Sequence, residues 1–200
     1  MSQDSTRDYF DGQADSYQQA SDAWPWSWLR LREARAVAAL LGRVQGHRLL
    51  DLGCGAGYYT RYFLARGAVH VVAVDRSAPM TAHLPAQRVT PITADAGEVR
   101  FDQPFSRMVS AGLMEFVPDP ERVLRNARNA AEQGGIMALL TPEAGLLGSL
   151  YRRFHLGHGV EIRLFAYDEL TAMAQRCGWR VVDHRRVFPF TLALRLEAGS

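Results

Sequence analysis

Short apolar runs alternate with helix-forming stretches along most of this chain. Residues 69–74 are the clearest strand, because β-branched side chains dominate the run and Asp75 ends it. Four more runs share this short, apolar character: residues 47–52, 89–94, 107–111 and 136–140. Strands that alternate with helices are typical of a doubly wound, mostly parallel α/β sheet.

The helical stretches carry recognisable ends. Four segments predict helices: residues 30–41 before Gly42, 56–66 before Gly67, 118–132 before Gly134 and Gly135, and 167–176 before Gly178. Residues 180–187 and 190–196 predict two last strands around Pro189, and their short connection requires antiparallel pairing. The chain therefore predicts a Rossmann-like, seven-stranded sheet with an antiparallel C-terminal hairpin strand and helices on both faces.

A glycine-rich turn follows the first predicted strand. The sequence at residues 51–57 is Asp-Leu-Gly-Cys-Gly-Ala-Gly. Glycine accepts backbone angles that a side chain forbids, and it lets a ligand lie directly on the main chain. Ligands of open α/β sheets bind beyond the carboxyl ends of the strands, which is where this turn falls.

Acidic residues mark three consecutive strand ends. Asp51 stands at the glycine turn, Asp75 ends the second strand and Asp95 ends the third. A carboxylate at the end of strand two can accept both hydroxyls of a ribose, and Asp95 could meet an adenine amino group. Together with the glycines, these residues predict a nucleoside-containing ligand.

Residues 51–57 resemble motif I of the class I S-adenosylmethionine-dependent methyltransferases, in the ubiquinone and menaquinone type of small-molecule enzymes. The resemblance runs from Tyr9 to the C-terminus, through segments at residues 9–17, 72–80, 94–96, 110–119 and 132–139. It implies S-adenosyl-L-methionine as cofactor and S-adenosyl-L-homocysteine as product. The methionine-binding, ribose-binding and adenine-binding segments follow one another in the family's order.

The resemblance also implies individual roles. Gly53, Gly55 and Gly57 would lie against the methionine portion, Asp51 would meet its amino group and Tyr17 its carboxylate end. Asp75 would hold the ribose, Met80 would pack on adenine and Asp95 would hold the adenine amino group. The remaining residues that we expect at the cofactor are Cys54, Arg76, Ala96, Ala111 and Gly112.

The catalytic residues are harder to read. Many relatives have leucine-glutamate-histidine where this chain has Met114-Glu115-Phe116, so no role of that histidine can be transferred to Phe116. His155 and His158 are candidate bases, because histidine titrates near neutral pH; the alternative for each is a surface or capping histidine. These histidines favour an oxygen acceptor over nitrogen or carbon.

Candidate substrate contacts lie outside motif I. Trp24, Trp26 and Trp28 could wall an apolar acceptor, or could dock the N-terminal region on the sheet. Met114 and Arg152 are further candidates, and exposed arginines are common. We expect one domain over residues 1–200, with an N-terminal helical cap at 1–45 and a substrate-covering insertion at 142–166.

Composition narrows the function classes. The net charge of +2 gives no electrostatic case for nucleic acid, and the 48% hydrophobic content suits one sizeable core. Two cysteines provide neither a disulfide framework nor a four-thiolate zinc site, so we expect no metal and a cytoplasmic location. No apolar run is long enough for a membrane span. The sequence gives no indication of the oligomeric state.

Two other enzyme classes fit the sequence less well, and two further functions stay open. A nicotinamide dehydrogenase would need a small residue where this chain has Tyr58, and a nucleic-acid base methyltransferase would need an Asn/Asp-Pro-Pro-aromatic segment after strand four. A protein methyltransferase has no fixed substrate signature. A non-catalytic S-adenosylmethionine-binding partner or regulatory subunit is the alternative from another class.

Overall fold

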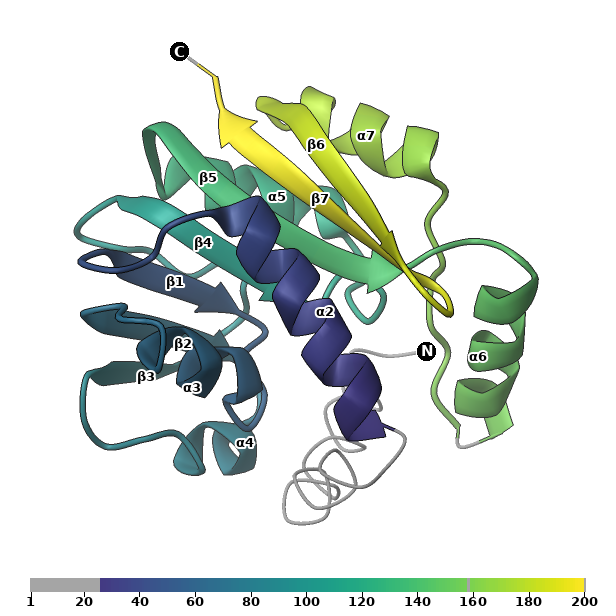
Figure 1. Ribbon diagram of the computed structural model, residues 1–200, viewed down its shortest axis with the longest axis horizontal. Coiled ribbons are helices and arrows are strands. Elements are labelled where there is room, and N and C mark those ends of the chain that lie inside the picture. The colour runs from purple at the N-terminus through teal and green to yellow at the C-terminus, as the bar shows by residue number, and fades with distance from the viewer. Residues whose placement is uncertain (1–25, 158, 200) are drawn as a thin grey trace.

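The computed structural model describes residues 26–157 and 159–199, with Trp26 described by its backbone alone. One seven-stranded sheet forms the centre of the molecule, in the order β3-β2-β1-β4-β5-β7-β6 (Figure 1). The strands are β1 (Arg48–Leu52), β2 (His70–Asp75), β3 (Val89–Thr93), β4 (Phe105–Ala111), β5 (Ala131–Pro142), β6 (Trp179–Val187) and β7 (Thr191–Ala198). The first five run parallel, and β7 pairs antiparallel with both β5 and β6. The predicted fold class is confirmed.

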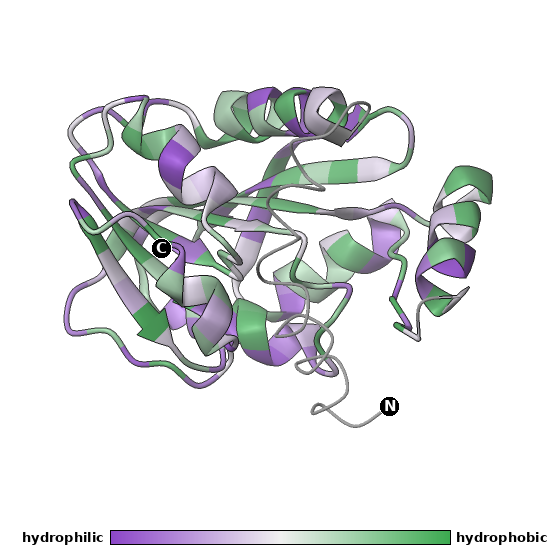
Figure 2. Cartoon of the chain, turned by 90° about the horizontal axis from the view of Figure 1, so that it is seen from below, coloured by the Kyte–Doolittle hydropathy of each residue, from purple (hydrophilic) through white to green (hydrophobic). Residues whose placement is uncertain are grey.

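Helices cover both faces of the sheet. On one face α2 (Trp26–Leu41) and α3 (Tyr58–Leu64) pack on a core that includes Leu49, Val71 and Val109. On the other face α5 (Pro120–Asn129) and α7 (Tyr167–Arg176) pack on a second core that includes Leu50 and Met108. In Figure 2 the strands between these helices are mainly hydrophobic, as burial on both faces requires.

Two further helices lie at the carboxyl edge of the sheet. The short α4 (Ala78–Ala82) follows β2 and begins at Ser77, whose hydroxyl accepts a hydrogen bond from the backbone N–H of Met80 at 3.3 Å. The longer α6 (Leu146–Gly157) follows β5 and stands to the side of the sheet in both ribbon views (Figures 1 and 2). The residues predicted as an insertion, 142–166, therefore contain this projecting helix.

Most predicted boundaries lie within three residues of the observed ones, but α2 begins four residues before its predicted start, at Trp26, and β5 begins five residues before its predicted start, at Ala131. The helix predicted over residues 118–132 is α5, which begins after the N-cap residue Asp119 and ends at Asn129. The expected helix-terminating glycines lie inside β5 instead. A Cβ on Gly135 would come 2.9 Å from the carbonyl oxygen of Phe105, so this glycine permits close backbone approach between β5 and β4.

None of the helices in the described ranges combines the length and the apolar character that a bilayer crossing requires.

Candidate cofactor site

The glycine turn joins β1 to α3 in a left-handed backbone conformation. Gly53, Gly55 and Gly57 have φ values of +73°, +51° and +87°. The backbone N–H groups of Gly53 and Cys54 both donate to the carbonyl oxygen of Val74, at 2.8 and 3.0 Å. The turn is thus tied to the end of β2, and residues other than glycine would be strained at all three positions.

The three glycines differ in what lies above them. A Cβ on Gly53 would come 2.7 Å from Cβ of Leu113, and one on Gly57 would come 2.5 Å from a methyl carbon of Leu84. A Cβ on Gly55 would meet nothing within 4 Å. Gly53 and Gly57 therefore allow the protein to pack on itself, whereas Gly55 presents open backbone on which a ligand could lie.

Asp75 stands beside this open backbone, and Asp95 lies one strand further along the sheet edge. The carboxylate of Asp75 accepts hydrogen bonds from the backbone N–H of Gly55 at 2.8 Å and of Ser77 at 3.0 Å. The carboxylate of Asp95 accepts from the N–H of Gly97 at 2.8 Å and lies 3.6 Å from the guanidinium nitrogen Nε of Arg76. Because β3, β2 and β1 are neighbours in the sheet, the acids at their ends stand along one edge, as predicted.

Asp51 has a different environment from the other two acids. Its side chain is buried, and its Oδ2 accepts a hydrogen bond of 2.6 Å from the hydroxyl of Thr60. Burial raises the pKa of Asp51 to about 7, although the Thr60 hydrogen bond opposes the shift. Asp51 thus supports the turn from within the protein, and its contact with a cofactor amino group stays a prediction.

The segment after β4 carries a buried acid that the predicted site residues did not include. Gly112 has φ +75°, and a Cβ there would lie 3.8 Å from Oε1 of Glu115. Glu115 is 5% exposed and accepts a hydrogen bond of 3.3 Å from the hydroxyl of Thr141. Burial raises the pKa of Glu115 to about 8. The signal in the sequence was an acid in an otherwise apolar segment, at the position where the family's motif also has glutamate.

Several predicted site residues are buried in the structure. Met80, Cys54 and Ala96 have little exposed surface, and burial raises the pKa of the Cys54 thiol. Met114 belongs to the hydrophobic core that faces α5 and α7. Contacts of these side chains with cofactor or substrate stay predictions.

The candidate base His155 lies beside the segment that follows β4. Its ring lies 6.1 Å from the ring of Phe116 and 4.5 Å from that of Tyr151, both in edge-to-face geometry. The structure therefore places a histidine close to the position where many relatives carry one in the motif itself. Arg152, on the same helix, is exposed.

Of the remaining aromatic and histidine residues predicted at the site, only Trp28 has a side chain that the structure describes. Trp28 is about half exposed, and the Arg32 guanidinium lies over its ring at 4.6 Å. Tyr17, Trp24 and His158, and the side chain of Trp26, lie outside the described residues.

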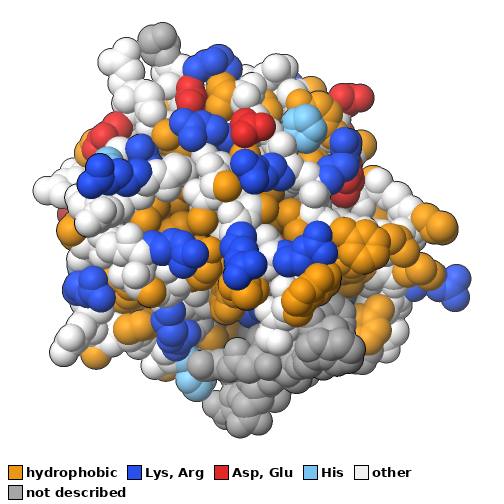
Figure 3. Space-filling view, viewed as in Figure 1, with side chains coloured by type: hydrophobic (Ala, Val, Ile, Leu, Met, Phe, Trp, Pro, Cys, Tyr) orange, Lys and Arg blue, Asp and Glu red, His pale blue; other side chains and the backbone are white. Residues whose placement is uncertain are grey.

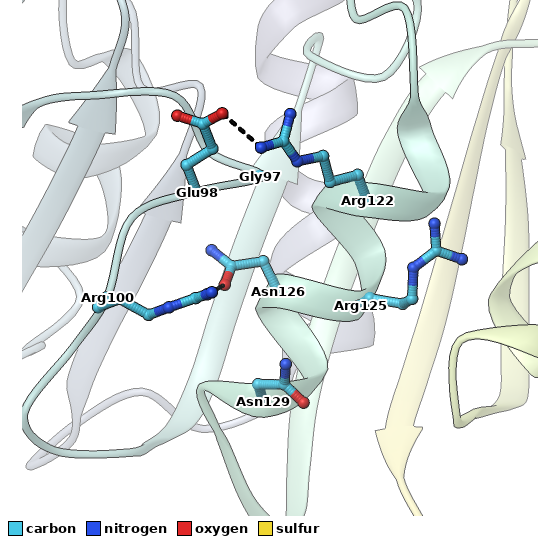
Figure 4. Close-up of a pocket in the computed structure, with 7 residues that line it drawn as sticks. All are labelled: Gly97, Glu98, Arg100, Arg122, Arg125, Asn126 and Asn129. Atoms are coloured by element: carbon cyan, nitrogen blue, oxygen red, sulfur yellow. Dashed lines mark hydrogen bonds and ion pairs between the residues drawn. The ribbon is translucent and has the colours of Figure 1, made fainter.

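A pocket of about 260 Å³ opens elsewhere, between α5 and the loop after β3 (Figure 4). Arg100 donates to Oδ1 of Asn126 at 2.7 Å, and Nδ2 of Asn126 donates to the carbonyl oxygens of Ala96 and Val99. These bonds fasten the loop to α5. The pocket is lined by this loop and α5 and does not include the glycine turn.

Comparisons with known proteins agree with this geometry. Residues 26–184 match a family described as a methyltransferase domain. The malonyl-[acyl-carrier protein] O-methyltransferase of Pseudescherichia vulneris is 28% identical over 175 residues, which cover 82% of this chain and 66% of that protein. The chain thus spans less than two thirds of that relative's length.

Two solved structures share the fold. One is a complex of the Haloferax volcanii Trm112 methyltransferase activator with a methyltransferase, at TM-score 0.81 and 16% identity, covering 96% of this chain and 98% of that one. The other is magnesium protoporphyrin IX methyltransferase from Synechocystis PCC 6803 with bound S-adenosylhomocysteine, at TM-score 0.77 and 15% identity, covering 99% and 100%. The chain therefore belongs to the methyltransferase domain family, and it shares its fold with these two neighbours.

Proposed function

We propose that this methyltransferase transfers the methyl group of S-adenosylmethionine to an oxygen atom of a small molecule. The observation that carries the cofactor part of this proposal is the open backbone at Gly55, whose N–H donates to the carboxylate of Asp75, with Asp95 one strand further along the same sheet edge. A ligand with a ribose and an adenine could satisfy both acids while its remaining part lies on the glycine turn.

The residues present fit this cofactor. Asp75 would hold the ribose hydroxyls, because its carboxylate is already oriented by the N–H groups of Gly55 and Ser77. Asp95 would accept from the adenine amino group. The backbone of Gly55 would lie along the methionine portion, where a side chain at this position would fill the space needed by the ligand. Gly53 and Gly57, which pack against Leu113 and Leu84, would hold the turn in the conformation that exposes Gly55.

The protein's own chemical task is modest. The cofactor supplies an activated methyl group on a sulfonium, so the protein has mainly to orient an acceptor and exclude water. His155 is the residue that we propose as proton acceptor for a hydroxyl nucleophile, since it lies next to Phe116 in the segment after β4. His158 is proposed for the same role from the sequence alone.

Support for an oxygen acceptor comes from the name of the relative from Pseudescherichia vulneris, which is an O-methyltransferase. For the acceptor we propose contacts with Trp24, Trp26 and Trp28 of the N-terminal region and with the exposed Arg152 of α6. Met114 is buried in the core, so it would support the acceptor site from below. A small molecule with an aromatic or apolar portion suits these side chains.

A second candidate function follows from the structurally similar methyltransferase that was solved in complex with the Haloferax volcanii Trm112 activator. In that alternative this chain binds the cofactor but needs a partner subunit for turnover, or acts as a protein methyltransferase. Methyl transfer to small molecules by the purified chain alone would contradict the need for a partner.

Calorimetric titration of the purified chain with S-adenosylhomocysteine tests the cofactor site, with Asp75→Ala as the comparison. We expect micromolar binding that the substitution abolishes. An acceptor screen with radiolabelled S-adenosylmethionine follows, in which His155→Ala should lower turnover of a hydroxyl acceptor while leaving cofactor affinity unchanged. A folded protein that binds no S-adenosylhomocysteine would refute the proposal.

A further inference from the structure

Helix α6 exposes a row of large apolar side chains to solvent. Leu146, Leu150 and Phe154 follow one another at helical spacing, Leu147 lies beside this row, and Leu156 stands near the end of the helix. The exposed fractions of these five side chains lie between 42% and 82%. Single exposed leucines are common on protein surfaces, whereas contiguous apolar patches mark binding surfaces. We call the five residues the α6 patch.

A different side of α6 packs on the protein. Gly148 is buried, and a Cβ there would collide with the carbonyl oxygen of Glu143 at the end of β5. The ring of Tyr151 stacks on that of Phe190, with 4.4 Å between the ring centres, and His155 is the residue that lies beside the segment after β4. These contacts fasten the helix, so the α6 patch is not what holds α6 in place.

A further exposed ring belongs to the turn between β6 and β7, which lies beside α6 (Figure 1). Phe188 in this turn is 62% exposed, and the stacking of Phe190 on Tyr151 brings the turn against the helix. In Figure 3 hydrophobic side chains gather on the right of the view, where Figure 1 places α6 and this turn. The exposed apolar surface on this side of the molecule therefore comes from two separate elements.

The charges on α6 are of one sign. The sequence has no acidic residue between Glu143 and Glu161, whereas Arg152 and Arg153 both lie in the helix and are exposed. Within the described part of the chain neither arginine forms an ion pair. Glu143, just before the helix, is already paired with Arg186 at 2.7 Å. The helix thus presents leucine and phenylalanine side chains together with positive charge that no acid of α6 balances.

This combination decides between possible occupants of the α6 patch. A second copy of the chain would bring the arginines of two α6 helices together, and like charges repel. A partner protein would have to offer a groove that is both apolar and acidic to a helix that projects from the sheet. A bilayer with anionic lipids meets both needs, because acyl chains accept the leucine and phenylalanine side chains and lipid phosphates accept the guanidinium groups.

We propose that α6 docks this protein on the surface of a bilayer that contains anionic lipids. The α6 patch enters the boundary between headgroups and acyl chains, and Arg152 and Arg153 lie at the level of the phosphates. The association is peripheral, with the helix lying along the surface. It needs no cofactor, so it is independent of the site at the glycine turn. Because α6 also carries His155, docking holds the segment after β4 beside the bilayer.

The experiment is co-sedimentation of the purified whole chain with vesicles, either of phosphatidylcholine alone or of phosphatidylcholine mixed with phosphatidylglycerol. We expect binding to the mixed vesicles that weakens as salt is added, and weaker binding to phosphatidylcholine alone. A chain that sediments with neither kind of vesicle would overturn the proposal. Light scattering of the free protein tests the second copy as occupant. A dimer that Leu150→Ser dissociates, without vesicle binding by the wild type, would assign the α6 patch to self-association instead.

Variants at exposed positions test the α6 patch without disturbing the core. Leu146→Ser and Leu150→Ser should each weaken binding to the mixed vesicles by about fivefold or more, since each removes an apolar side chain from the bilayer. Val69→Ser is the matched control, because Val69 is also about half exposed but precedes β2 at the amino edge of the sheet. Arg153→Gln should weaken binding by about fivefold and reduce its salt dependence. Wild-type binding by the doubly substituted Leu146→Ser, Leu150→Ser protein would overturn the proposal, with circular dichroism as the check on folding.

Discussion

Gly55 offers the sharpest test of the candidate site, because the effect of a substitution on ligand binding can be separated from its effect on backbone strain. Gly55 and Gly46 both have positive φ, +51° and +82°, and a Cβ would meet nothing within 4 Å at either position. Gly46 precedes β1 at the opposite, amino edge of the sheet. Gly46→Ala is therefore a matched control for Gly55→Ala.

The expected loss of stability is small and similar for the two variants. A non-glycine residue in the left-handed region costs about 1–2 kcal/mol. Replacement of glycine also restricts the unfolded chain, which returns about 0.4–1 kcal/mol. Each variant should thus lower the free energy of unfolding by about 1 kcal/mol, which urea denaturation can measure.

Binding should distinguish the variants. In Gly55→Ala the new methyl group occupies the space in which we place the methionine portion of the cofactor, and such overpacking costs about 1–3 kcal/mol. The dissociation constant for S-adenosylhomocysteine should rise by about fivefold to 150-fold. Gly46→Ala should bind as wild type. Equal affinity of the two variants would show that no ligand lies on Gly55.

Three further predictions follow from the buried and strand-end acids. Asp75→Asn should weaken S-adenosylhomocysteine binding by at least about tenfold in calorimetry, since charge-assisted hydrogen bonds contribute about 1.5–3 kcal/mol. Thr60→Val should lower the free energy of unfolding by about 1–3 kcal/mol, because the buried Asp51 loses its hydrogen-bond donor; full stability in urea denaturation would contradict this reading of the 2.6 Å contact. The folded-state pKa values of Asp51, Glu33 and Glu115 are raised from 3.8 or 4.5 to about 7, 7 and 8, so the folded protein binds more protons than the unfolded chain in this range. Stability should therefore fall as pH rises from about 4 through 8, and a urea midpoint that increases over this range would be the wrong sign.

The N-terminal half of the sheet could be predicted closely because its signals are local. The β-branched side chains of residues 69–74 predict a strand, and the observed strand β2 runs from His70 to Asp75. Gly42 was expected to end a helix, and its N–H donates to the carbonyl oxygen of Ala38 at 3.0 Å with φ +74°. Such features depend on a few adjacent residues.

The beginning of β5 could not be predicted in this way. Gly134 and Gly135 read as the end of a helix, whereas they lie inside a strand that begins at Ala131. What decides the boundary is pairing with β4, where Phe105 lies opposite Ala131 with a register shift before Arg107. Contacts between strands distant in sequence leave no local pattern.

The sequence by itself determined the alternating strands and helices, the glycine turn and the acids at three strand ends, because each depends on local conformational preference or on repeated spacing. The tertiary structure decided how these groups are used. It buried Asp51 against Thr60, left the backbone of Gly55 open, and brought Glu115 within hydrogen-bond distance of Thr141 although 26 positions separate them in the chain. Burial and proximity set the pKa of a carboxyl group, and both arise only when distant segments pack together.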